Sequence, residues 1–213
     1  MTTAVRRPVS AVVISFNEER NIGACLESLR FADEIVVVDS GSTDATLEIA
    51  RRYTDKVLDV PWGGFGPQKQ AAVERASHDV VLNVDCDEQV TPELAEEIGR
   101  LLAGEDIAAA YTVPRRTFVG EKEIRHCGWS PDRTTRLFDR TKARFTADLV
   151  HERVDVSGET RPLRNPLLHH SFSGIGEILG KMNRYSDLSA RQMFERGRKG
   201  SVIDLTLRPG FAF

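Results

Sequence analysis

Two acidic side chains follow a short apolar run in the first half of the chain. Asp85 and Asp87 stand one residue apart, directly after residues 80–84, which have the length and composition of a buried strand. Carboxylate oxygens are the ligands that Mg²⁺ and Mn²⁺ prefer, and these ions also bind phosphate oxygens. The pair therefore predicts a divalent cation that holds a diphosphate. The alternative is a solvated acidic turn that includes Glu88.

Two more polar clusters follow apolar runs in the same half. Ser15, Asn17 and Glu18 come after the first run of the chain, and Asp39 comes after the second. In open α/β folds, ligands bind beyond the carboxyl ends of the strands. We therefore expect the three clusters to form one binding site.

The elements that must position these residues alternate between strands and helices. Strands are expected at residues 9–15, 34–38, 56–60 and 80–84, and helices at residues 17–30, 42–53, 67–76 and 91–102. Asn17, Ser42 or Thr43, and Thr91 are the expected N-caps. Strands that alternate with helices predict an α/β fold with a largely parallel sheet.

The pattern changes after Gly104. Strands are expected at residues 108–119, 134–138, 144–147 and 166–172, among loops rich in Arg, Gly and Pro. A helix with regularly spaced apolar residues returns at about 175–196. We expect an α/β half at 1–104, a mixed-strand half of the same domain at 105–173, and a C-terminal helix with a basic tail at 174–213.

Bulk composition narrows the class of protein. The chain has 213 residues, 40% of them hydrophobic, enough for one domain with a full core. A net charge of -3 argues against nucleic acid as a partner. Cys25, Cys86 and Cys127 form no CxxC pair and no zinc pattern, which favours a reducing compartment. No stretch is apolar for long enough to span a bilayer, and residues 1–8 lack the apolar core of a signal peptide.

Several motifs resemble those of one enzyme family. VVISFNEE at residues 12–19, VVDSGSTDAT at 37–46 and DCDE at 85–88 are similar to motifs of the inverting family-two glycosyltransferases of GT-A fold. FGPQKQ, GWSPD, RLF, VHE and LLHHSF resemble a narrower subgroup, the bacterial lipopolysaccharide-core β-glucosyltransferases. The resemblance implies a Rossmann-like, mostly parallel sheet flanked by helices, with a mixed-strand acceptor half and a C-terminal helix. It assigns nucleotide-sugar binding to residues 1–104, acceptor binding and catalysis to 105–173, and membrane association to 174–213.

The resemblance also implies roles for the donor-side residues. Asp39 hydrogen-bonds the nucleobase edge, with a capping Asp in a turn as the alternative. Asp87 is the stronger metal ligand, and Asp85 binds the ribose or reaches the metal through water. The other residues expected to bind the nucleotide sugar are Ser15, Asn17, Glu18, Gln68, Lys69 and Arg136. Lys offers the diphosphate a point charge, and Arg offers it two parallel N–H donors. The alternative for both residues is an ordinary charged side chain on the surface.

Glu152 is the candidate general base on the acceptor side. An inverting transfer needs a carboxylate that takes the proton of the acceptor hydroxyl, as inverting glycosidases take a proton from water. His151 is expected to orient this base or to touch the diphosphate. Asp148 and Glu88 are the competing bases, and an ion pair with Arg153 is the structural alternative for Glu152. For His169 and His170, structural roles are favoured, with one of them facing the site as the alternative.

These expectations combine into one function. We expect a metal-dependent inverting glycosyltransferase that uses Mg²⁺ or Mn²⁺ and moves glucose from a UDP donor to a glycolipid such as the lipopolysaccharide inner core. The alternatives are a polyprenyl-phosphate glycosyltransferase and a nucleotide-sugar-binding protein without turnover. The lipid acceptor and the basic tail predict a cytoplasmic protein in peripheral contact with the inner face of the bacterial inner membrane. The abrupt apolar end at 205–213 indicates a shortened chain.

Overall fold

The computed structural model describes residues 6–126, 132–147, 152–172, 174–195 and 197. The chain divides into two units, residues 1–174 and residues 175–213. The first unit contains the sheet. The second contains α5 (Ile175–Glu195), the helix expected there from its apolar spacing.

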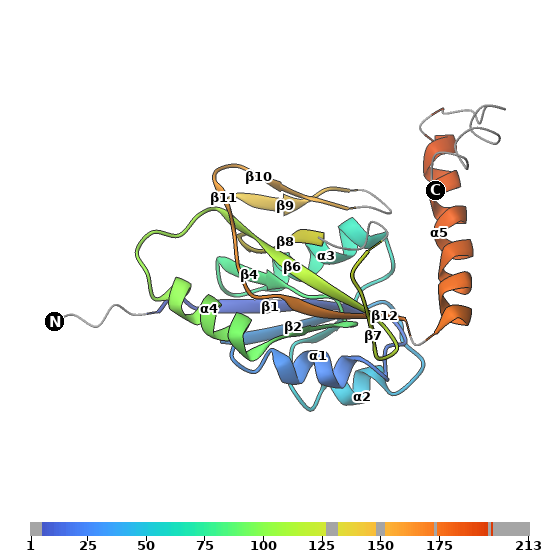
Figure 1. Ribbon diagram of the computed structural model, residues 1–213, viewed down its shortest axis with the longest axis horizontal. Coiled ribbons are helices and arrows are strands. Elements are labelled where there is room, and N and C mark those ends of the chain that lie inside the picture. The colour runs from blue at the N-terminus through green and yellow to red at the C-terminus, as the bar shows by residue number, and fades with distance from the viewer. Residues whose placement is uncertain (1–5, 127–131, 148–151, 173, 196, 198–213) are drawn as a thin grey trace. The chain divides into compact units, whose positions relative to one another are not determined.

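A twisted sheet forms the centre of the first unit (Figure 1). Its strands in spatial order are β3 (Val57–Asp59), β2 (Glu34–Asp39), β1 (Val9–Ser15), β4 (Val80–Asn83), β8 (Asp132–Asp139), β6 (Ala110–Val119), β12 (Leu167–Phe172) and β5 (Glu88–Val90). The first four run parallel. The mixed part begins at β8, which is antiparallel to both β4 and β6.

Shorter strands complete the first unit. β7 (Lys122–Ile124) and β11 (Thr160–Pro162) pair with β6, while β9 (Ala143–Phe145) and β10 (Val154–Val156) form a separate antiparallel pair. The predictions did not include β5, β7, β10 and β11. Each of these strands has three residues, too few to show a hydrophobic period.

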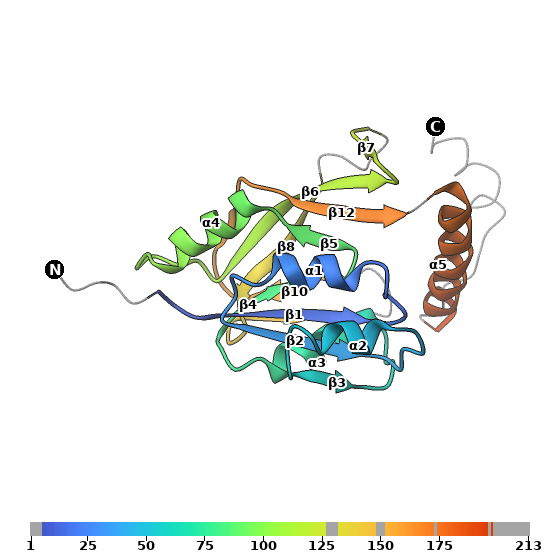
Figure 2. The same ribbon diagram turned by 90° about the horizontal axis from the view of Figure 1, so that it is seen from below.

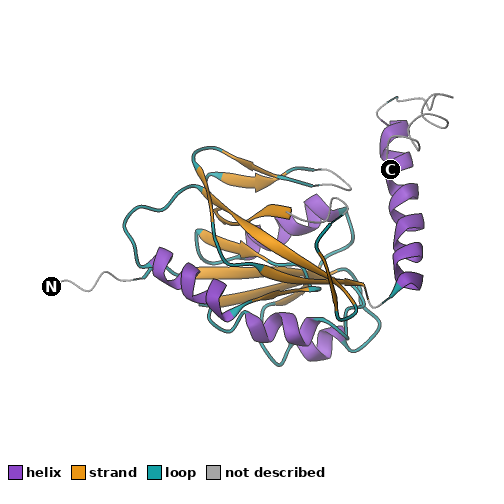
Figure 3. Cartoon of the chain, in the orientation of Figure 1, coloured by secondary structure: helices purple, strands orange, loops and turns teal. Residues whose placement is uncertain are grey.

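Helices and the β9–β10 pair cover the two faces of the sheet (Figures 1, 2 and 3). One face carries α1 (Ile22–Ser28), α2 (Thr46–Ala50) and α4 (Pro92–Leu102), and the other carries α3 (Phe65–Arg75). Successive side chains of a strand point to opposite faces. Two hydrophobic cores result, one between the sheet and α1, α2 and α4, and one between the sheet and α3. Val13 of β1 packs in the former, and Val12 packs in the latter together with Phe145 of β9.

The α/β fold class and the mostly parallel sheet are confirmed, but two predicted caps are wrong. α1 begins at Ile22 with Asn21 as its N-cap, and α2 begins at Thr46 with Ala45 as its N-cap; neither side chain accepts a capping hydrogen bond from the helix backbone. The polar side chains expected as caps bind a neighbouring loop instead. The predicted cap of α4 is confirmed, because the Thr91 hydroxyl accepts from the backbone of Leu94 at 3.2 Å.

Candidate functional site

Two loops at the carboxyl edge of the parallel strands are bonded to each other. The backbone N–H of Asn17 donates to the Ser42 hydroxyl at 2.8 Å, and the backbone of Thr43 donates to Asn17 Oδ1 at 2.8 Å. Asn17 has a φ of 54°, a left-handed conformation that Asn tolerates better than most residues. The backbone of Glu18 donates to the Thr46 hydroxyl at 2.7 Å. Asn17 and Glu18 therefore help to shape this edge of the sheet.

Asp39 lies at the centre of these loops and is fully buried. Its carboxylate accepts from the hydroxyls of Ser15 and Ser42, at 2.7 and 2.5 Å, and from the backbones of Gly41 and Ser42, at 2.9 and 2.7 Å. A carboxylate has about four lone-pair positions. A nucleobase would have to share or displace one of these bonds, so the geometry gives Asp39 a loop-organising role besides the predicted one.

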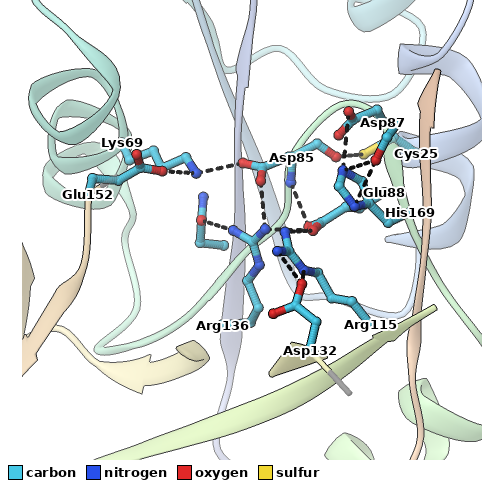
Figure 4. A network of polar contacts seen from close by, with 12 residues as sticks. Cys25, Lys69, Asp85, Asp87, Glu88, Arg115, Asp132, Arg136, Glu152 and His169 are labelled. Carbon is cyan, nitrogen blue, oxygen red and sulfur yellow. Dashed lines mark hydrogen bonds and ion pairs between the residues drawn. The ribbon is translucent and has the colours of Figure 1, made fainter. Parts of the chain in front are cut away.

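Seven side chains of alternating charge form a second feature, which we call the ionic chain (Figure 4). Its members in order are Asp132, Arg115, Glu88, Arg136, Asp85, Lys69 and Glu152. Successive N–O distances are 2.8 Å from Asp132 to Arg115 Nε, then 3.2, 2.6, 2.6, 2.8 and 2.6 Å. The ionic chain connects α3, β5, β6 and β8 with two further segments, the one directly after β4 and the one directly before β10.

The members at the middle of the ionic chain hold one another in their charged forms. Burial alone would raise the pKa of the Asp85 carboxyl, but the charges of Arg136 and Lys69 hold that pKa well below its usual value. Burial alone would lower the pKa of Lys69, but the carboxylates of Asp85 and Glu152 raise it. The pKa of Arg136 is raised in the same way, against burial, by Asp85 and Glu88. These groups are therefore charged at neutral pH.

Asp87 faces a different partner, as Figure 4 shows. Its Oδ2 lies 3.4 Å from His169 Nε2, and its backbone carbonyl accepts from the backbone of His170 at 2.7 Å. A carboxylate oxygen beside an imidazole nitrogen is a donor pair that suits Mn²⁺ and similar ions. Within the described residues, no group of three or more His, Cys, Asp and Glu is placed to hold a metal ion. Phosphate oxygens and water would have to supply the remaining ligands.

Three residues expected to bind the nucleotide sugar are buried and contact other protein groups. Arg136 is 3% exposed and donates to Asn83 at 2.8 Å besides its two carboxylate partners. Lys69 is 5% exposed. Gln68 is buried and donates to the carbonyl of Val60 at 2.9 Å. In this geometry all three side chains are committed to protein partners.

Glu152 is ion-paired, and its partner is Lys69 of α3 rather than the adjacent Arg153. The predicted companion His151 lies outside the described residues, as do Asp148 and Cys127. Glu88, one of the competing bases, is fully buried between Arg136 and Arg115.

Sequence reasoning missed two participants in this region. Arg115 and Asp132 extend the ionic chain beyond Glu88. His169, whose favoured role from the sequence is structural, faces Asp87. Arg115 and Asp132 are opposite each other in the register of β6 and β8. Their pairing follows from a strand register that the sequence does not reveal, since the two residues lie far apart along the chain.

Comparisons with known proteins identify the family. The family model described as Glycosyl transferase family 2 matches residues 10–165. The chain belongs to glycosyl transferase family 2. It is therefore a glycosyltransferase, and the resemblance seen in its motifs is confirmed.

Two curated relatives of this family 2 glycosyltransferase match along most of their length. The lipopolysaccharide core biosynthesis glycosyltransferase LpsC of Rhizobium meliloti (strain 1021) is 35% identical over 218 residues, covering 97% of this chain and 79% of LpsC. An uncharacterized glycosyltransferase of Rickettsia conorii is 31% identical over 219 residues, covering 97% of this chain and 77% of that protein. The chain is thus related to a transferase of lipopolysaccharide core biosynthesis.

A solved structure supports the fold of this family 2 member. The crystal structure of S. aureus TarS residues 1–349 aligns with a TM-score of 0.57 at 20% identity, over 77% of this chain and 60% of that one. The likeness concerns the fold alone, and confirms the GT-A architecture. Among the described residues, α5 included, no helix has the length and apolar character needed to cross a membrane.

Proposed function

We propose that this family 2 glycosyltransferase transfers a sugar, with glucose favoured, from a UDP donor to a glycolipid such as the lipopolysaccharide inner core. The transfer inverts the anomeric centre and uses Mg²⁺ or Mn²⁺. One observation carries the proposal. Lys69 forms ion pairs with both Asp85 and Glu152, and Asp87 follows Asp85 two residues later. The candidate base Glu152 and the candidate metal ligand Asp87 therefore both lie near Asp85.

The charge of the site supports a divalent cation. The acids of the ionic chain are Asp132, Glu88, Asp85 and Glu152, and its bases are Arg115, Arg136 and Lys69, which leaves one excess negative charge before Asp87 is counted. A diphosphate is also anionic and would be repelled from such a site. Asp87 and His169 would hold the ion, with phosphate oxygens and water as its other ligands. When bound, the ion stabilises the charge that develops on the leaving diphosphate.

Glu152 acts on the acceptor side in this proposal. The acceptor hydroxyl attacks the anomeric carbon as Glu152 takes its proton, and the bond from that carbon to the phosphate oxygen breaks with release of UDP. The Glu152 side chain is 16% exposed, so a hydroxyl can reach it. Asp85 would contact the ribose or a water bound to the ion.

The choice of donor and acceptor takes support from the relatives. TarS has been solved in complex with UDP-GlcNAc, which favours a uridine nucleotide here. LpsC is named for lipopolysaccharide core biosynthesis, which favours a lipid-linked saccharide acceptor. Peripheral contact with the inner face of the bacterial inner membrane follows from an acceptor of that kind.

Calorimetric titration tests this proposal. Purified protein is titrated with UDP, GDP and ADP, with and without Mn²⁺, and the series is repeated on Asp87→Ala and on the exposed control Asp55→Ala. We expect Mn²⁺-dependent binding of UDP that weakens at least about tenfold in Asp87→Ala and is unchanged in the control. Absence of nucleotide binding under every metal condition would overturn the proposal. Binding that ignores both the metal and Asp87 would overturn the metal role.

A further inference from the structure

We propose that Lys69 is a positioning residue, which holds the candidate base Glu152 against Asp85, and that it does not bind the diphosphate. This inference rests on the proposed function, in which Glu152 is the base. It replaces the role that the sequence motif suggested for Lys69. Its consequence is that the donor-side and acceptor-side carboxylates are set in place by one ammonium group.

The surroundings of the Lys69 ammonium carry the inference. Nζ lies 2.6 Å from Glu152 Oε1 and 2.8 Å from Asp85 Oδ1, and the side chain is 6% exposed. The ring of Phe145 covers it further, with its centroid 5.9 Å from Nζ. An ammonium group has three N–H donors. One donates to Glu152, and the ammonium is also ion-paired with Asp85 in a buried position, so little of the group is open to a phosphate.

The helix that carries Lys69 also fixes the backbone near Glu152. Gln70 Oε1, one residue further along α3, accepts from the backbone of Phe145 in β9 at 3.0 Å. Phe145 pairs with Val154 of β10, two residues beyond Glu152. One helix thus anchors both the hairpin that bears the base and the carboxylate of the base itself.

Losing this anchor should affect the chemical step more than donor binding. Without Lys69, the Glu152 side chain regains its rotamers, and its carboxylate is no longer held toward the site. A shift of about 1 Å in a reacting group can lower a rate by about 100-fold. Nucleotide binding should be largely preserved, since Asp85 keeps its ion pair with Arg136, and Asp87 faces His169.

A double-mutant cycle between Lys69 and Glu152 tests the inference. Transfer from UDP-glucose to lipopolysaccharide truncated at its inner core is followed by mass spectrometry in wild type, Lys69→Met, Glu152→Gln and the double variant. We expect Lys69→Met to lower kcat about 10- to 100-fold, with an unchanged Kd for UDP. In the Glu152→Gln background, the same substitution should change kcat by less than about threefold, because a base that is absent cannot be mispositioned.

Two further variants serve as controls. Lys56→Met removes another lysine that is ion-paired to a glutamate, Glu34, outside the ionic chain, and should leave kcat and the Kd for UDP unchanged. Lys69→Arg keeps the charge with a longer reach and should recover part of the lost kcat. If Lys69→Met does not fold, Lys69→Arg decides: a reduced kcat with an unchanged Kd for UDP supports positioning.

The outcomes separate the inference from the proposed function. A Kd for UDP that rises more than about tenfold in either Lys69 variant, or additive losses in the cycle, would overturn the positioning role and favour a diphosphate contact. A Glu152→Gln variant with wild-type kcat would remove the base and the positioning role together, since another group would then take the proton of the acceptor hydroxyl. Absence of transfer by the wild type, despite UDP binding, would overturn the proposed acceptor and the inference that rests on it.

Discussion

Arg136 illustrates how a side chain suited to one ligand can be used by the fold itself. Its guanidinium bonds Asn83, Asp85 and Glu88 and is almost fully buried. The planar fork of Arg suits two carboxylates as well as it suits phosphate. A buried charge network of this kind adds little net stability when complete, but it is costly to break.

We predict that Arg136→Met lowers the free energy of unfolding by about 3–5 kcal/mol, because the buried carboxylates of Asp85 and Glu88 lose their shared cation. Urea denaturation followed by circular dichroism measures this. The control is Arg52→Met, at an exposed ion pair with Glu48, which should cost less than about 1 kcal/mol. Equal losses of unfolding free energy in the two variants would show that the buried ion pairs of Arg136 contribute no more to stability than an exposed ion pair.

The first turns of the helices show where N-cap signals in the sequence predict the start of a helix correctly. Thr91 is followed by Pro92 at the first helical position, and its hydroxyl accepts from the backbone of Leu94. α1 and α2 begin without a side-chain cap, since the polar residues before them bind the opposite loop. Local capping signals therefore hold where no neighbouring loop competes for the same side chains.

At the level of this element, we predict that Thr91→Ala destabilises the protein by about 1 kcal/mol, because the first turn of α4 loses its cap. The Thr91 hydroxyl also donates to the carbonyl of Pro166 at 3.2 Å, which ties α4 to the segment before β12. Thermal unfolding of Thr91→Ala and Thr91→Ser separates these effects of the hydroxyl from those of the methyl group. A Thr91→Ser variant as unstable as Thr91→Ala would exclude the hydroxyl as the cause.

At the scale of the whole molecule, the site and the core belong to one unit. Both hydrophobic cores and the whole ionic chain lie within residues 1–174. The second unit carries exposed apolar side chains on α5, among them Phe194 and Met182. Helices with exposed apolar residues beside basic ones bind anionic membrane surfaces.

We predict that a chain ending at Gly174 keeps metal-dependent UDP binding with an unchanged Kd but loses binding to vesicles that contain anionic lipid. Calorimetry measures the first property and co-sedimentation measures the second, with zwitterionic vesicles as the control. Equal sedimentation of the shortened and full chains would place membrane contact in the first unit. Loss of UDP binding would show that the first unit does not fold without residues 175–213.

The sequence by itself determined the fold class, the family and most of the elements. Apolar runs followed by Ser15, Asp39 and Asp85 report the carboxyl ends of parallel strands, because period and length are local properties of the chain. The same local signals indicated the three-residue strands β3 and β9 but did not reveal β5 and β10, whose pairing depends on distant partners.

Only the tertiary structure decided what the charged residues contact. Lys69 meets Glu152 across 83 positions and Arg136 meets Asp85 across 51, and strand order and register bring these charges together. Burial then selects the pairings, since a charge removed from water must find an opposite charge or change its protonation state. Lys and Arg, which suggested phosphate ligands in the sequence, are also the residue types that a buried carboxylate requires as partners.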